Sequence, residues 1–105
     1  MRLNSGVTLE MVRDNLMQAL SSHISIKIVN NPLDKNSRWI EVNKEAFVGV
    51  RIFLKDEHIL IAEHTPSFFA KVLSGGIVNE AIHRGARREF KNQITSYLIR
   101  EFYTQ

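Results

Sequence analysis

The feature that most constrains this fold is an alternating run of residues bounded by two short polar connections. Within residues 46–54 every second position is aliphatic, which is typical of a half-buried strand: Val48, Val50, Ile52 and Leu54. Polar segments at 43–45 and 55–57 separate this run from further strands predicted at 38–42 and 58–62. Because parallel strands need a crossover of about a dozen residues, these short connections predict antiparallel pairs.

A fourth strand is predicted upstream, at residues 23–29. There Ile24, Ile26 and Ile28 alternate with polar side chains, the same period of two. The next eight positions, 30–37, are rich in Asn, Asp, Pro and Ser. These residues favour turns, so we expect an exposed loop between this strand and the one at 38–42.

Helices are predicted on both sides of the strands. The apolar residues of 9–20 repeat at helical spacing, and Thr8 is placed to cap the first turn. Pro66, after Thr65, favours a short helix over 66–74 that ends at the glycine pair 75–76. From about residue 77 to the C-terminus, four residues form the apolar stripe of a longer helix: Phe90, Ile94, Tyr97 and Leu98.

These patterns predict a single α+β domain over residues 1–105. We expect a four-stranded, mainly antiparallel sheet with N- and C-terminal helices packed on one face, in the order αββββαα. The expected core is aliphatic: Leu9, Val12, Leu16, Leu20, Ile24, Ile26, Ile28, Ile40, Val42, Val48, Val50, Ile52, Ile94 and Leu98.

Composition narrows the class of protein. The chain has no cysteine, which excludes disulfides and thiol chemistry and favours a cytoplasmic location. The net charge of +3 is small for a dedicated nucleic-acid tail. The most apolar stretch, 68–82, is shorter than the roughly 20 residues that span a bilayer, and it contains charged side chains. We therefore expect no membrane span.

Aromatic side chains gather on the strand face that the helices should leave uncovered. Trp39, Phe47 and Phe53 alternate away from the aliphatic face. Three interpretations stay open: a second, minor core, the interface of a homodimer, or a surface that stacks bases beside Arg51. Phe68 and Phe69 are further interface candidates, in an apolar segment that either plugs the core or opens onto a partner.

The last third of the chain carries a basic cluster, which consists of Arg84, Arg87, Arg88 and Lys91. On a helix Arg84, Arg88 and Lys91 share one face. Such a face can simply be solvated, with nearby glutamates as local partners. It can also contact phosphates or an acidic protein.

No pattern indicates catalysis, a metal or a cofactor. His58 and His64 lie about 20 Å apart on an extended segment, too far to share a metal. Glu80 and His83 have ligand spacing on a helix, but a di-metal bundle needs two such motifs. None of the serines lies in a nucleophile-elbow sequence.

The function predicted from the sequence is a non-enzymatic protein-interaction or self-association module, expected to form a homodimer. The alternative is a nucleic-acid-binding module that uses the basic C-terminal helix. An enzyme is the third choice, because the convergent polar residues of an active site are missing.

Overall fold

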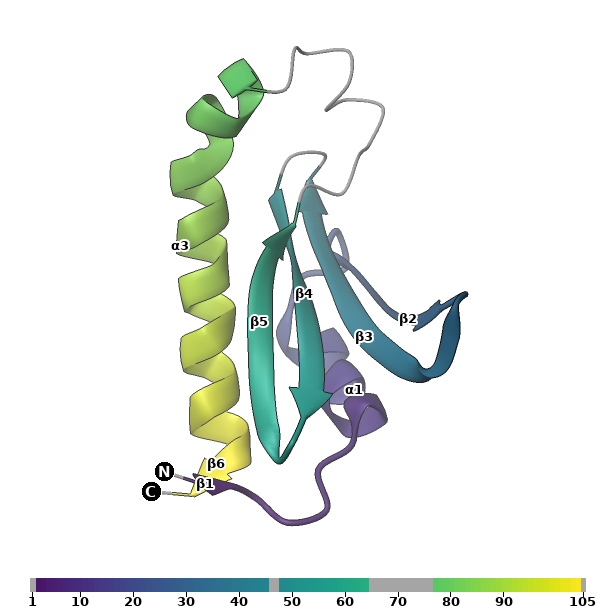
Figure 1. Ribbon diagram of the computed structural model, residues 1–105. Coiled ribbons are helices and arrows are strands. Elements are labelled where there is room, and N and C mark those ends of the chain that lie inside the picture. Colours follow the sequence, from purple (N-terminus) through teal and green to yellow (C-terminus); the bar gives the residue numbers. More distant parts are fainter. Residues whose placement is uncertain (1, 46–47, 65–76, 105) are drawn as a thin grey trace.

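The fold is α+β, and its described part has one main antiparallel sheet and two main helices (Figure 1). The computed structural model describes residues 2–45, 48–64 and 77–104, with side chains for all of these except residue 35 and residues 77–83. The predicted helix at 66–74, and with it Phe68 and Phe69, lies outside the described residues, as does Phe47.

The main sheet has four strands in the order β2-β3-β4-β5, each antiparallel to the next. Their bounds are β2 Ser25–Asn31, β3 Asp34–Glu45, β4 Val48–Lys55 and β5 His58–His64. A separate two-stranded sheet, which the sequence did not predict, joins β1 (Arg2–Leu3) to β6 (Tyr103–Thr104). The antiparallel sheet predicted from the short connections is confirmed.

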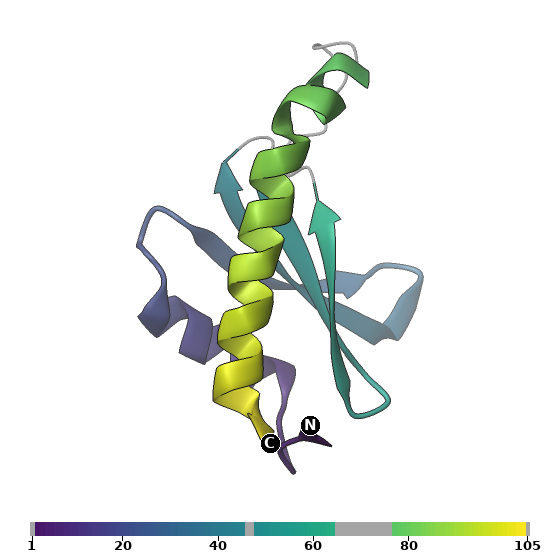
Figure 2. The same ribbon diagram turned by 90° about the vertical axis from the view of Figure 1, so that its left-hand side faces the viewer.

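Both main helices lie on one face of this sheet. Helix α1 (Leu9–Ala19) packs against β2 and β3, and helix α3 (Ile77–Phe102) packs against β4 and β5. Figure 2 shows α3 running across the front of the sheet. Thr8 has extended backbone angles and its hydroxyl accepts a hydrogen bond from the Met11 N–H at 3.2 Å, so the predicted N-cap is confirmed.

The core between helices and sheet is mostly the one expected. The central strands supply Ile40, Val42, Val50 and Ile52, all with 0% exposure. Four expected core residues are only half-buried at its border: Leu20, Ile24, Ile26 and Ile28. Ile26 and Ile28 lie on the edge strand β2, and Leu20 and Ile24 lie in the connection between α1 and β2. Three further buried residues were not among the expected core residues: Leu3, Phe90 and Phe102.

Two expected loops are part of strands instead. Residues 30–37 were expected to form a loop, but β2 extends to Asn31 and β3 begins at Asp34, which leaves a two-residue turn. The turn-forming side chains act inside the hairpin: Asn31 Oδ1 accepts from the Leu33 N–H, and Asp34 Oδ1 from the Asn36 N–H. A register shift between Asn30 and Asn31 accommodates them.

The other misplaced loop is the segment at 43–45, which continues β3 through Glu45 with a register shift after Asn43. The connection at 55–57 is confirmed as tight. Asp56 and Glu57 have φ of 52° and 64°, the left-handed angles that a two-residue hairpin turn requires.

The core predicts a large difference between neighbouring positions of α1. Leu16 is fully buried, whereas Met17 is 58% exposed. We expect Leu16→Ala to lower the free energy of unfolding by about 2–5 kcal/mol, since it removes apolar contacts and leaves a cavity. Met17→Ala should change it by no more than about 0.5 kcal/mol. Urea denaturation measures both, and equal effects would contradict the packing of α1 on the sheet.

An ion pair between α1 and β3 predicts a pH dependence. Arg38 Nη1 donates to Glu10 Oε1 at 2.6 Å, and this hydrogen bond lowers the pKa of Glu10. A carboxyl whose pKa is lower in the folded than in the unfolded state stabilises the fold. The contribution is complete at a pH above the unfolded-state pKa, and it is lost as the pH falls through the folded-state pKa. Glu10→Gln should therefore be less stable than wild type near neutral pH, with a difference that shrinks below about pH 4.

The control for this ion pair is the same comparison in an Arg38→Gln background, by urea denaturation at each pH. There the effect of Glu10→Gln should be smaller at neutral pH and nearly independent of pH. An unchanged pH dependence without Arg38 would contradict the assigned cause.

Candidate functional site

The candidate site is the outer face of the sheet, which we define as the face opposite α1 and α3. Cross-strand register lines up four apolar side chains on this face. Val29 pairs with Trp39, and Phe53 pairs with Leu60. The Trp39 and Phe53 ring centroids are 5.9 Å apart, with ring planes at 42°. We call these four residues the aromatic row.

Trp39 and Phe53 therefore face outward together, as their alternation predicted. Both rings are half-buried, whereas Leu60 at the edge is 51% exposed. Cross-strand aromatic pairs stabilise a sheet, so the row has a structural role even without a partner. Apolar side chains thus line both faces of the sheet, and the described helices α1 and α3 cover one of them.

A charged row lies beside the aromatic row. Lys27, Glu41 and Arg51 are cross-strand neighbours on β2, β3 and β4. The Trp39 Nε1–H donates to Glu41 Oε1 at 3.3 Å, and the Arg51 guanidinium carbon lies 5.4 Å from the Trp39 ring centroid. A cation over an indole face is attracted by the ring quadrupole, so Trp39 is held from two sides.

Two polar atoms of this face are buried without a hydrogen-bond partner in the described part of the chain. Arg51 Nε lies 3.4 Å from Glu41 Oε1, within ion-pair distance but without the geometry of a hydrogen bond. Asn43 Oδ1 has no donor. Unsatisfied buried polar groups cost free energy, so these two atoms lower the stability of this face.

The basic cluster of α3 is not one continuous surface. Arg84 and Arg88 are exposed and Lys91 is half-buried, but Arg87 is only 5% exposed. Arg87 precedes Phe90 and Ile94 by three and seven residues, so it lies on the buried stripe of the helix. The Lys44 ammonium lies 5.7 Å from the Phe90 ring centroid, a contact between β3 and α3 that the sequence did not suggest.

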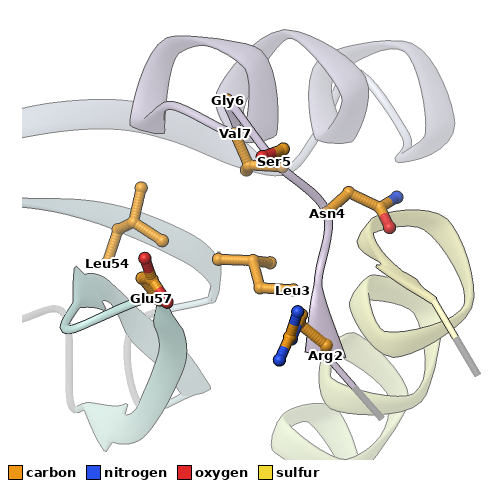
Figure 3. A pocket seen from close by; sticks show the side chains of 8 residues that line it. All are labelled: Arg2, Leu3, Asn4, Ser5, Gly6, Val7, Leu54 and Glu57. Atoms are coloured by element: carbon orange, nitrogen blue, oxygen red, sulfur yellow. The ribbon is translucent and has the colours of Figure 1, made fainter.

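A cavity of about 430 Å³ lies where the N-terminal segment meets the β4–β5 turn (Figure 3). Leu3 and Leu54 approach from the two sides, with Arg2 and Glu57 at the rim. The Asn4 side chain points away toward the end of α3, and its oxygen accepts a hydrogen bond from the Thr104 hydroxyl of β6. Among the described residues that line this cavity there is no histidine, so they do not pair Ser5 with an imidazole base.

Metal ligands do not converge in the described ranges 2–45, 48–64 and 77–104. No group of three or more His, Asp or Glu residues there is arranged to hold an ion. Nor is any helix within those ranges long and apolar enough to cross a membrane. Comparison of the chain with protein-family models, curated proteins and solved structures gives no match.

Proposed function

We propose that this chain is a non-enzymatic self-association module that forms a homodimer through the outer face of its sheet. The observation that carries the proposal is the aromatic row, since both main helices pack on the inner face and leave Trp39, Phe53 and Leu60 at the surface. Aromatic side chains and arginine are enriched in protein interfaces. The outer face combines such a row with Arg51 on the neighbouring row.

Packing two such faces together is a favourable way to bury the row. Sheets stack face to face about 10 Å apart, with side chains from both interdigitating. A two-fold axis would bring the same patch of each copy together, as most homodimers do. The charged row of Lys27, Glu41 and Arg51 would then lie at the rim of the interface.

Sedimentation equilibrium tests this proposal. We expect wild type to form a dimer at micromolar concentration. Phe53→Glu should raise the dimer dissociation constant by roughly 30-fold or more, because a carboxylate buried in an apolar interface costs about 2 kcal/mol or more. The fluorescence of Trp39, the single tryptophan, should shift on dissociation.

The matched control is Met17→Glu, which places the same charge on an exposed position of α1. It should leave the dimer intact. Circular dichroism shows whether each variant is folded. A wild-type monomer at high concentration, or a folded Phe53→Glu variant that still dimerises, would rule out this interface.

Nucleic-acid binding is the second candidate, and the exposure of Arg84 and Arg88 on α3 favours it. These cations, with Lys91, can contact about three phosphates. On duplex DNA, a plot of the logarithm of the binding constant against the logarithm of the salt concentration would then have a slope of roughly −2 to −3. The buried Arg87 is not counted among these contacts.

Titration of labelled single- and double-stranded oligonucleotides at low and moderate salt tests the second candidate. Arg84→Glu and Arg88→Glu should weaken binding uniformly across sequences. The control on the same helix is Arg100→Glu. Arg100 stacks over Tyr97 and lies more than two turns beyond Lys91. Absence of binding at low salt would eliminate this candidate.

A further inference from the structure

Strand β5 forms an open edge of the main sheet. It pairs with β4 along its whole length without a register shift, and in the described part of the chain no strand pairs with its other side. Edges are usually protected by charged side chains, proline, bulges or a covering helix or loop. The opposite edge, β2, has Lys27, a register shift and Pro32 just beyond its end. Within His58–His64, β5 has no lysine, proline or register shift, and its one acidic side chain is Glu63.

One hydrogen bond shows which backbone groups of β5 face this edge. The Ile59 N–H donates to the Tyr103 hydroxyl at 2.9 Å instead of to β4. Backbone groups alternate in direction along an antiparallel strand, so those of Ile61 and Glu63 point the same way as those of Ile59. Tyr103 thus caps the edge at Ile59, and among the described residues the open part consists of Ile61 and Glu63.

An apolar pocket of about 150 Å³ adjoins this open edge on the inner face. It lies between β5 and α3, and its lining is largely aliphatic: Ile59, Ile61, Thr95, Leu98, Ile99 and Tyr103. A strand paired to β5 would point the side chain opposite Ile61 to the same face, toward this pocket. An apolar cavity of this size accommodates a group as large as benzene, so one branched aliphatic side chain would fit.

Glu63 adds a charge to the same face, two residues beyond Ile61. It is exposed, and the ion pairs within the described ranges do not involve it. In an antiparallel partner strand, the residue opposite Glu63 lies two positions before the one opposite Ile61. A basic residue there would form a cross-strand ion pair.

We propose that the β5 edge binds an extended peptide by strand addition, with the pattern basic–x–aliphatic. The aliphatic side chain enters the pocket beside Ile61 and Ile99, and the basic one pairs with Glu63. Backbone hydrogen bonds to Ile61 and Glu63 supply affinity, and the two side chains supply specificity. This site is separate from the outer face and does not rest on the proposed self-association.

A second copy of β5 is a poorer occupant than such a peptide. Antiparallel self-pairing that keeps the inner side chains on one face places Glu63 opposite Ile59, Ile61 or Glu63 of the other copy. The first pairing needs the Ile59 edge, which Tyr103 caps. The second puts a carboxylate at the apolar pocket, and the third opposes two like charges.

The test is fluorescence anisotropy with two labelled, capped peptides, Thr-Ser-Lys-Thr-Ile-Ser and the same sequence with Glu in place of Lys, both of which end before the position opposite the capped Ile59. Wild type should bind the Lys peptide about 5-fold more tightly than the Glu peptide, the upper range for one cross-strand ion pair. Glu63→Lys should reverse the preference. This charge-swap rescue would not follow from a merely structural role of Glu63.

Pocket entry is tested by Ile99→Trp, which fills the cavity and should weaken the Lys peptide at least 10-fold. The control is Arg100→Trp at the next, exposed position. Amide shifts in NMR spectra should locate the peptide on Ile61 and Glu63. No binding at about 1 mM peptide, an unchanged preference in Glu63→Lys, or β5 shifts that follow protein concentration without peptide would overturn the proposal.

Discussion

The burial of one aliphatic face of β3 and β4 is the constraint on which the rest of this structure depends. Ile40, Val42, Val50 and Ile52 are sealed beneath α1 and α3, and they fix the pairing register of the two central strands. A shift by one residue would exchange the two faces of a strand. The position of Trp39 beside Phe53, and of Glu41 beside Arg51, is therefore a consequence of core packing rather than of any attraction between these groups alone.

The sheet, its antiparallel sense and both main helices could be predicted from the sequence, because each is encoded by a local periodicity. The lengths of the hairpins could not. Asn31 and Asp34 favour turns both in a long loop and in a tight hairpin turn, so their identity does not give the length of the connection. The pairing of β2 with β3 decides that length. The β1–β6 pair was also inaccessible, since two-residue strands carry no periodicity.

The candidate site was predictable to a similar degree. Alternation predicts that Trp39 and Phe53 share a face, but the cross-strand contacts of Glu41 and Arg51 depend on register. On α3 a closer reading of spacing would have separated Arg87 from its neighbours, because it precedes Phe90 and Ile94 at helical intervals. Which part of the β5 edge is open could not be predicted from a local pattern. Its limit is set by Tyr103, which is remote along the chain from the Ile59 amide that it caps.

The pairing of β1 with β6 has a consequence for folding kinetics. The Asn4 N–H donates to the Phe102 carbonyl oxygen at 2.8 Å, and the contact of Thr104 with Asn4 spans a sequence separation of 100 residues. Closing so long a loop has a high entropic cost, which short hairpins do not share. The hairpins of the main sheet can form first, and the β1–β6 pair then forms late. By the same reasoning it opens early, before the core beneath the helices is exposed.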